Sequence, residues 1–206
     1  MLHLWGRLSS INVRKAVWAL QETGVAFERS DAGMAFGIVK TPAYLQMNPN
    51  ALVPTLQDGD LTLWESNVIV RYVCAQYAPG TLYPLDLAKR FDAERWMDWQ
   101  QTTLNRAGGA AFLQWIRTPA AQRDATAIAQ SVAAMAPFLQ WLDRHLGEHA
   151  FMAGDQFTMA DIPIGCEIHR WFGLPQARPA LPHLERWYAG ILQRPAIRGV
   201  LDQPLS

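Results

Sequence analysis

The sequence predicts a small α/β domain followed by an all-helical domain. Up to residue 77, short apolar runs bounded by turn residues alternate with stretches whose apolar residues keep helical spacing. From residue 88 onward helical spacing recurs and no convincing pair of strands follows. Between the two parts, "APGTLYPLD" contains two prolines and a glycine, which is typical of a linker. We therefore expect domains at residues 1–78 and 89–206, joined by a linker over 79–88.

The first domain is predicted to run in the order strand, helix, strand, helix, β-hairpin, helix. The corresponding residues are 2–6, 11–23, 25–30, 41–48, 53–66 and 66–77. Gly24 is suited to end the first helix, and Asp58-Gly59 is a strong signal for the turn of the hairpin. Ser66 is well suited to cap the last helix, because its hydroxyl can accept from an unpaired N–H of the first turn.

In the second domain, three stretches have helical periodicity: 88–116, 124–147 and 183–201. The clearest additional helix start is "DQFTMADI". Thr158 and Asp161 stand three apart, as in a capping box, with Asp in place of the usual Glu or Gln. We assign this motif the structural role of starting a core helix.

The composition excludes several classes of partner. Eighteen basic residues balance eighteen acidic ones, so the formal charge is zero and no basic face for nucleic acid or an anionic membrane is indicated. The first residues lack the pattern of a secretory signal. No apolar run approaches the roughly 18 residues that span a bilayer. We expect a cytoplasmic protein without nucleic-acid or membrane partners.

The two cysteines, Cys74 and Cys166, lie far apart among apolar residues. There is no CxxC motif and no Cys/His ligand spacing. We therefore expect two buried reduced thiols, a reducing compartment and no metal, rather than a disulfide framework, a zinc site or a dithiol redox centre.

Three motifs in this order resemble the cytosolic glutathione transferase family: "SSINVRK" after the first strand, "NPNALVPTL" followed by "WES", and "FTMADI". The resemblance covers essentially the whole chain and is to a serine-type, theta-like bacterial member. It implies a thioredoxin-like α/β N-terminal domain, an all-α C-terminal domain, glutathione as cosubstrate and a homodimer.

The resemblance also implies binding residues in the first domain. Val53-Pro54 looks like the family's Val–cis-Pro turn, in which the backbone at Val53 pairs with the cysteinyl backbone of glutathione as an added strand does. Glu65 would meet the ammonium group, and Ser66 would bind the γ-glutamyl carboxylate at a helix N-terminus. The alternatives are an ordinary strand-initiating proline and a plain helix cap beside a solvated Glu65.

In serine-type members, a hydroxyl after the first strand donates to the sulfur of glutathione. Such a bond to a charged group is worth about 1.5–3 kcal/mol, so it lowers the thiol pKa by roughly one to two units. The positive end of the helix beginning near Ile11 adds to this effect. Ser10 is our first candidate, Asn12 with its amide N–H₂ the second and Ser9 the third. For either serine the alternative role is a simple helix cap.

Two departures from the family pattern concern the glycyl carboxylate. Ala51 and Leu52 stand where the family often has Gly and Lys, and Leu52 cannot bind an anion. The candidates for binding the glycyl carboxylate are therefore Lys40 and Arg7. The first strand is followed by neither the tyrosine nor the cysteine that the other classes of the family use.

The sequence therefore predicts a glutathione transferase whose thiolate attacks a small apolar electrophile. Candidate walls for the electrophile are Phe112, Trp115 and Arg106, whose alternative role is core or dimer packing. Two other functions remain open. One is a glutathione-dependent disulfide or peroxide reductase with Asn12 at the sulfur, and the other is a non-catalytic glutathione-binding or assembly module.

Overall fold

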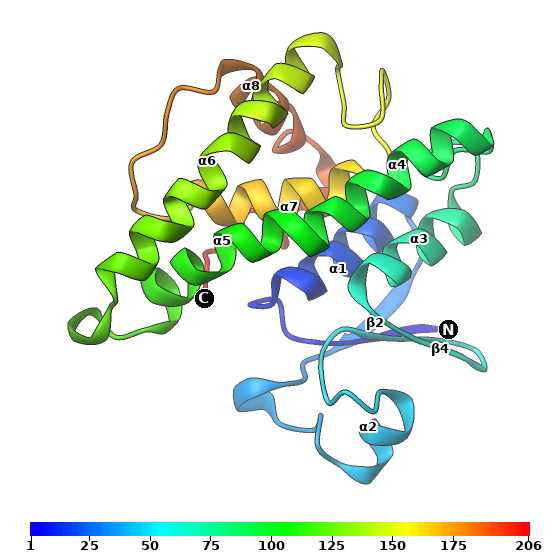
Figure 1. Ribbon diagram of the computed structural model, residues 1–206. Coiled ribbons are helices and arrows are strands. Elements are labelled where there is room, and N and C mark those ends of the chain that lie inside the picture. The colour runs from blue at the N-terminus through cyan, green and yellow to red at the C-terminus, as the bar shows by residue number, and fades with distance from the viewer. The chain divides into compact units, whose positions relative to one another are not determined.

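The computed structural model describes residues 1–206 and divides into two compact units, Met1–Leu85 and Asp86–Ser206. The division lies within the expected linker, residues 79–88. The first unit contains the only sheet, and the second is helical (Figure 1).

The sheet of the first unit has four strands in the order β2-β1-β3-β4. They are β1 (Leu2–Trp5), β2 (Phe27–Ser30), β3 (Thr55–Asp58) and β4 (Leu61–Trp64). β1 runs parallel to β2 and antiparallel to β3, while β3 and β4 form the antiparallel hairpin expected at Asp58-Gly59. The parallel pair requires a crossover connection, which a helix provides.

That crossover is α1 (Ile11–Thr23), which ends at Gly24 with φ +68°, as expected. The other helices of this unit are α2 (Pro42–Met47) and α3 (Ser66–Tyr77), together with a short 3₁₀ turn, η1 (Met34–Phe36). α1 and α3 lie side by side (Figure 1) and bury Val13, Val17, Ile69 and Val73. This packing brings their N-terminal ends together.

The prediction that Ser66 caps α3 is wrong by one residue. Glu65 is the N-cap, with φ +73° and no capping bond from its side chain, and Ser66 is the first helical residue. A positive φ at a residue other than glycine is a local departure that the sequence pattern does not reveal. The Ser66 hydroxyl bonds elsewhere, as described below.

The second unit contains five α-helices: α4 (Leu87–Trp99), α5 (Asn105–Phe112), α6 (Ala125–Glu148), α7 (Asp161–Phe172) and α8 (Pro182–Ile191). α6 packs against both α5 and α8, and α7 packs against α4, α5 and α8 (Figure 1). The side chains of Met135, Leu139, Leu142 and Ile168 are buried in this unit.

Two predicted helices differ from the structure. Residues 88–116 are not one regular helix, because π-helical turns η2 (Gln100–Leu104) and η3 (Leu113–Arg117) flank α5. In η2 the buried Gln100 side chain donates to Glu167 Oε2 at 3.1 Å, a tertiary contact that local periodicity cannot predict. The helix expected over 183–201 ends at Ile191, and a 3₁₀ turn, η5 (Pro195–Ile197), follows. The conformation before Pro195 disfavours continuation of the helix.

The predicted motif lies at the start of α7, but only one half of the capping box is formed, and the N-cap residue of the helix is Ala160, which makes no side-chain cap. Asp161 Oδ2 accepts from the Thr158 amide at 3.0 Å, and Thr158 Oγ1 accepts from the Ala160 amide at 3.3 Å. Asp161 Oδ1 also accepts from the Met152 amide and from Trp187 Nε1. Asp161 is fully buried, and burial raises its pKa to about 6 despite these hydrogen bonds.

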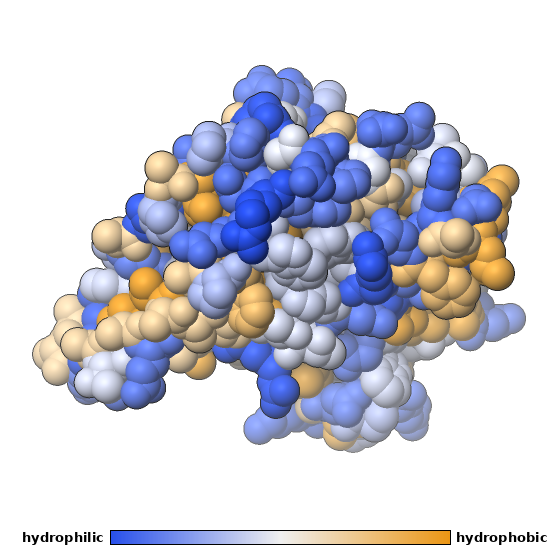
Figure 2. Space-filling view, turned by 45° about the horizontal axis from the view of Figure 1, so that its top comes forward, coloured by the Kyte–Doolittle hydropathy of each residue, from blue (hydrophilic) through white to orange (hydrophobic).

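No helix combines the length and apolar character that spanning a bilayer requires. Hydrophilic and apolar residues are interspersed over the face shown in Figure 2. Cys74 and Cys166 form no disulfide and are buried, and burial raises the pKa of the Cys74 thiol to about 12.

Candidate functional site

A hydrogen bond joins the N-terminal ends of α1 and α3. Ser66 Oγ, on the first residue of α3, donates to Asn12 Oδ1 on the first turn of α1 at 3.2 Å. The two residues are 54 positions apart in the chain. Two candidate site residues from different motifs are therefore in direct contact.

Ser10 is the N-cap residue of α1 by position, with an extended backbone (φ −92°, ψ +123°). Its carbonyl accepts from the amides of Val13 and Arg14, at 3.1 and 3.0 Å. Its side chain, however, makes no capping hydrogen bond. The hydroxyl of Ser10 is therefore not used in the way that the capping alternative requires.

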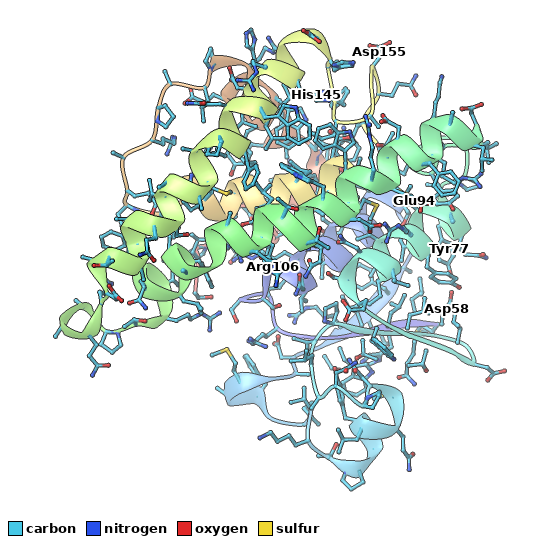
Figure 3. The ribbon with its side chains drawn as sticks, viewed as in Figure 1. Asp58, Tyr77, Glu94, Arg106, His145 and Asp155 are labelled. Carbon is cyan, nitrogen blue, oxygen red and sulfur yellow. The ribbon has the colours of Figure 1, made fainter.

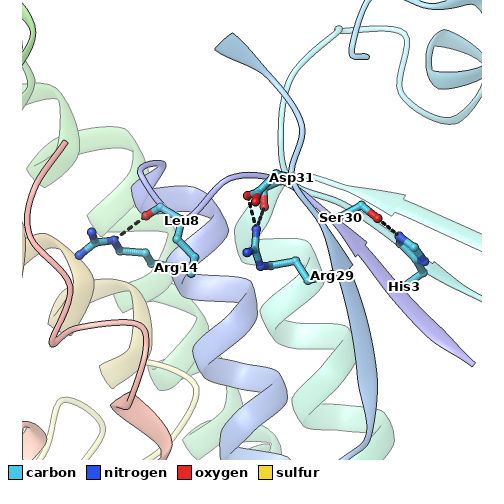
Figure 4. Close-up of polar contacts among 7 residues, drawn as sticks. His3, Leu8, Arg14, Arg29, Ser30 and Asp31 are labelled. Carbon is cyan, nitrogen blue, oxygen red and sulfur yellow. Dashed lines mark hydrogen bonds and ion pairs between the residues drawn. The ribbon is translucent and has the colours of Figure 1, made fainter. Parts of the chain in front are cut away.

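The loop that carries Ser10 is held by two arginines that the sequence analysis did not identify. Arg14 Nε donates to the Leu8 carbonyl at 2.7 Å (Figure 4). Arg29 Nη1 donates to the Gly6 carbonyl at 2.6 Å, and Arg29 also pairs with Asp31 (Figure 4). These contacts fix the backbone on which Ser10 stands.

The peptide bond between Val53 and Pro54 is cis, as the motif predicts. Val53 lies against two glycines: a Cβ atom placed on Gly6 would be 3.3 Å from Val53 Cβ, and one on Gly33 would be 3.6 Å from Val53 Cγ1. The Gly6 position would also be only 2.4 Å from Val13 Cγ2. The end of β1, the start of α1 and the cis-proline turn therefore meet where only a glycine fits.

A buried hydrogen-bond network holds the residue before this turn. The Leu52 carbonyl accepts from Tyr44 Oη at 2.7 Å and from Asn48 Nδ2 at 3.0 Å. Both groups also bond to Thr55 Oγ1, at 2.9 and 3.1 Å. Sequence reasoning used Asn48 only to mark the end of a helix, and the motif "NPNALVPT" was the available signal for this network.

Glu65 and the amide groups of α3 form the other side of the candidate site. Glu65 has φ +73°, a conformation that costs on the order of 1–3 kcal/mol and that clusters at functional sites. This backbone turn leads directly into α3, whose first amides have no partner within the helix. An anion placed there is favoured by the unpaired N–H groups and by the helix dipole.

Of the two residues expected to bind the glycyl carboxylate, Arg7 lies beside Gly33, which Val53 also approaches. Its Nη1 atom is 2.7 Å from the position that a Cβ of Gly33 would occupy, so it lies on the same side of Gly33 as Val53. Lys40 is exposed and follows the strained segment that includes Ile38, with φ +63°.

The candidate walls for the electrophile lie in the second unit. Arg106 is exposed on α5 (Figure 3), whereas Phe112 and Trp115 are partly buried. The Phe112 ring lies 5.6 Å from the guanidinium of Arg117 and 5.1 Å from that of Arg170. Trp115 Nε1 donates to Gln176 Oε1 at 3.0 Å. Phe112 and Trp115 thus have packing roles of their own, in line with the alternative considered for them.

Comparisons with known proteins agree with this arrangement. Residues 1–75 match the family model described as glutathione S-transferase, N-terminal domain, and residues 125–190 match the corresponding C-terminal domain. The chain is 40% identical over 208 residues to glutathione S-transferase GstB of Escherichia coli, with all of both chains covered.

Two further similar proteins are a solved structure with glutathione bound and a longer protein named as an elongation factor. The crystal structure of a theta class glutathione S-transferase from Xanthomonas axonopodis pv. citri with glutathione bound has a TM-score of 0.96 and 45% identity, covering 100% of this chain and 99% of that one. Probable elongation factor 1-gamma 2 of Arabidopsis thaliana is 30% identical over 193 residues, covering 91% of this chain and 46% of that protein. With its two-domain fold and its full-length similarity to GstB, this chain belongs to the glutathione S-transferase family.

Proposed function

We propose that this glutathione transferase binds glutathione at the N-terminal ends of α1 and α3 and activates its thiol with the hydroxyl of Ser10. The observation that carries the proposal is the 3.2 Å hydrogen bond from Ser66 to Asn12, because it joins the two helix ends. Two positive helix ends side by side favour a ligand with more than one negative charge. Glutathione with an ionised thiol is such a ligand.

Ser10 is proposed to donate to the sulfur because its side chain is not used as a cap. The free thiol has a pKa of about 8.5 and is only a few per cent ionised at pH 7. One hydrogen bond to the thiolate is worth about 1.5–3 kcal/mol, which lowers this pKa by roughly one to two units. Ser10 needs no base for this role, since glutathione, not serine, is the nucleophile.

The reaction proposed is a substitution at an apolar electrophile. The thiol proton passes to solvent, the thiolate sulfur forms a bond to the electrophilic carbon, and the leaving group departs with the electron pair of its own bond. No oxidant or reductant is required. The protein supplies the thiolate and positions the electrophile.

The remaining groups of glutathione are assigned by charge. The hydroxyl proton of Ser66 is directed at Asn12, so the amide N–H groups at the start of α3 are proposed to bind the γ-glutamyl carboxylate. Glu65 is proposed to meet the ammonium group. The Val53 backbone before the cis bond pairs with the cysteinyl backbone, and Arg7 binds the glycyl carboxylate.

A fluorescence titration tests this proposal. Trp5, on β1, and Trp64, at the end of β4, are in the same unit as the proposed site, and Trp64 is 41% exposed. Reduced glutathione should bind more tightly as pH rises through a value below the free thiol pKa, whereas S-methylglutathione should show no such dependence. Equal and pH-independent binding of both ligands would contradict activation of the thiol, and no binding of either would contradict the site itself.

A reductase is the second candidate function, and the position of Asn12 favours it. Because Asn12 Oδ1 accepts from Ser66, its N–H₂ group is left to donate to a sulfur atom. This arrangement suits disulfide exchange with Asn12 rather than Ser10 at the thiolate. Disulfide exchange and conjugation, both measured for Ser10→Ala and Asn12→Ala, would separate the two functions.

Members of this family are generally dimeric, so we propose a homodimer. We also propose a location in the cytoplasm, a reducing compartment, because the two buried cysteines form no disulfide. Light scattering that gives a mass near that of one 23.1 kDa chain would contradict the dimer. A non-catalytic glutathione-binding or assembly module is the third candidate, because a relative named as an elongation factor rather than a transferase matches 91% of this chain. Failure to bind glutathione at millimolar concentration would favour that module over the enzyme.

A further inference from the structure

A cavity of about 430 Å³ lies in the second unit between α7 and α8, which pack against each other (Figure 1). Its walls come from His169 and Phe172 at the end of α7, from Tyr188 and Leu192 on α8, and from the segment that joins the two helices. All of the residues that line it belong to the second unit, so its shape does not depend on where the first unit lies. Small-molecule sites have volumes in this range and combine apolar walls with a few polar groups.

Two aromatic rings form a corner of this cavity. The centroids of the Phe172 and Tyr188 rings are 5.3 Å apart, and the rings are nearly perpendicular, at 85°. The Tyr188 hydroxyl shares a hydrogen bond of 2.8 Å with His169 Nδ1, which fixes the orientation of the phenol ring. Leu192 lies one helical turn beyond Tyr188 and is 37% exposed. The corner therefore offers apolar contact to a ligand ring, which can pack on one aromatic face and against one edge.

Two opposite charges line the same cavity. The Arg178 guanidinium lies over the Phe172 ring, 4.3 Å from its centroid, and one of its N–H groups donates to the Phe172 carbonyl at 3.4 Å. A guanidinium has several N–H groups, so donors remain for a carboxylate. The exposed Glu185 carboxylate makes no hydrogen bond and no ion pair, so it is not paired with Arg178. Both charges lie beside the aromatic corner without neutralising each other.

This pair of charges selects for a ligand that carries both signs. A simple anion is attracted by Arg178 and repelled by Glu185, and the reverse holds for a simple cation. A zwitterion can meet each charge with its opposite, so it gains from both. An α-amino acid carries a carboxylate and an ammonium group on the same carbon, and an aromatic side chain on that carbon fits the corner of Phe172 and Tyr188.

We propose that this cavity binds an aromatic α-amino acid, with its carboxylate on Arg178, its ammonium group on Glu185 and its side chain on Phe172 and Tyr188. The proposal goes beyond the transferase function, because the residues assigned to glutathione all belong to the first unit. No bond forms or breaks in the cavity. A ligand that binds only the folded protein raises its melting temperature, so occupancy has a readout apart from catalysis.

The test uses para-fluorophenylalanine, because its fluorine NMR signal reports weak binding and the protein contains no fluorine. Two relatives of this probe each lack one charge. Para-fluorophenylpropionate has no ammonium group, and para-fluorophenethylamine has no carboxylate. Each compound is titrated into the whole chain, and thermal unfolding in the presence of the probe gives a second readout. The amino acid should bind saturably, more tightly than either relative, and should raise the melting temperature.

Two variants that each remove one charge should give opposite results. Arg178→Gln should weaken binding of the amino acid about twofold to fivefold, the effect of one exposed ion pair, without weakening that of the phenethylamine. Glu185→Gln should weaken binding of the amino acid by a similar factor without weakening that of the propionate. Arg144→Gln and Glu148→Gln are the matched controls, because both residues are exposed on α6 and neither lines this cavity. Neither control should change the binding of any probe.

A cavity-filling variant tests the location without removing a charge. Ala189 is exposed on α8 and lines the cavity, so Ala189→Phe should abolish binding of all three compounds. Lack of saturable binding of the amino acid up to its solubility limit would overturn the proposal. An equal loss for all three probes in Arg178→Gln, or equal binding of the three to the wild type, would also overturn it, because selection would then not depend on charge.

Discussion

Ser66, at the start of α3, donates a hydrogen bond to the side-chain oxygen of Asn12, at the start of α1. The bond has two consequences. It aligns the unpaired amides of two helices, and it directs the N–H₂ group of Asn12 away from Ser66. The start of α3, which is proposed to bind the γ-glutamyl carboxylate, is thus coupled to Asn12, the second candidate for the sulfur donor.

This coupling predicts a non-additive double-mutant cycle. Ser66→Ala and Asn12→Ala should each weaken glutathione binding, but the double variant should lose less than the sum of the two. The expected coupling is about 0.5–1.5 kcal/mol, the net value of one hydrogen bond. Calorimetric titration of glutathione into the four proteins measures it. Full additivity would mean that the bond has no bearing on the ligand.

The hydroxyl of Ser10 predicts a specific change in thiol ionisation. Ser10→Ala should raise the pKa of bound glutathione by roughly one to two units, because one hydrogen bond to the thiolate is lost. At a fixed pH near 6.5, kcat/KM for conjugation should therefore fall about 10-fold to 100-fold. Ultraviolet absorbance of the thiolate, followed against pH, measures the shift.

Ser9→Ala is the control for this prediction, since it removes a neighbouring hydroxyl while leaving that of Ser10 in place. It should change the thiol pKa far less than Ser10→Ala does. If Asn12→Ala raises the pKa and Ser10→Ala does not, the assignment of the sulfur donor is wrong.

Substitution of Gly6 by alanine should lower both the stability of the protein and its affinity for glutathione. A Cβ on Gly6 would lie 2.4 Å from Val13 Cγ2 and 3.3 Å from Val53 Cβ, at φ +153°. Gly6→Ala should therefore displace the cis-proline turn, lower the free energy of unfolding by about 1–3 kcal/mol and weaken glutathione binding. Urea denaturation and the fluorescence titration together measure both effects.

Gly24→Ala separates the two effects. Gly24 also has a positive φ, +68°, but a Cβ there would meet nothing within 4 Å. This variant should lose about 1 kcal/mol from backbone strain, with unchanged affinity for glutathione. Similar affinities in the Gly6 and Gly24 variants would contradict the role given to the contact with Val53.

Asp161 predicts a pH-dependent stability. Its pKa is raised from 3.8 to about 6 by burial, so the folded state takes up a proton between these values while the unfolded state does not. Stability from this group is therefore present at low pH and lost as pH rises through about 6. The difference in pKa corresponds to about 3 kcal/mol.

Asp161→Asn tests this effect. The variant should be less stable than the wild type at pH 7 by about 1–3 kcal/mol, because its N–H₂ group opposes N–H donors that the carboxylate accepts. The advantage of the wild type should grow as pH falls from 7 to 4, as followed by urea denaturation. His145, whose pKa is lowered by burial, is present in both proteins, so the difference removes its contribution. A difference that does not change with pH would contradict the raised pKa.

Local signals predicted the elements of this protein well. Gly24 ends α1, Asp58-Gly59 marks the hairpin, and Thr158 with Asp161 starts α7. Each of these depends on residues within a few positions of one another, whose backbone preferences act over that range. The cis bond before Pro54 was expected from a different source, the resemblance of Val53-Pro54 to the turn of a known family.

Long-range contacts decided what local signals could not. The π-helical turn at Gln100 accompanies a contact with Glu167, and the Leu52 carbonyl is held by Tyr44 and Asn48. The position of Ser66, one residue inside α3 rather than at its cap, depends on the conformation of Glu65. None of these features alters the spacing of apolar residues along the sequence, which was the signal used to predict the helices and strands.

The sequence by itself determined the two-part architecture, the order of the strands and helices in the first unit and the candidate residues of the glutathione site. Only the tertiary structure decided that Asn12 and Ser66 are bonded and that the hydroxyl of Ser10 makes no cap. The physical reason is the range of the interactions. The spacing of apolar residues and the residues that form turns depend only on positions close together in the sequence. A hydrogen bond between residues 54 positions apart, in contrast, exists only after two helices have packed.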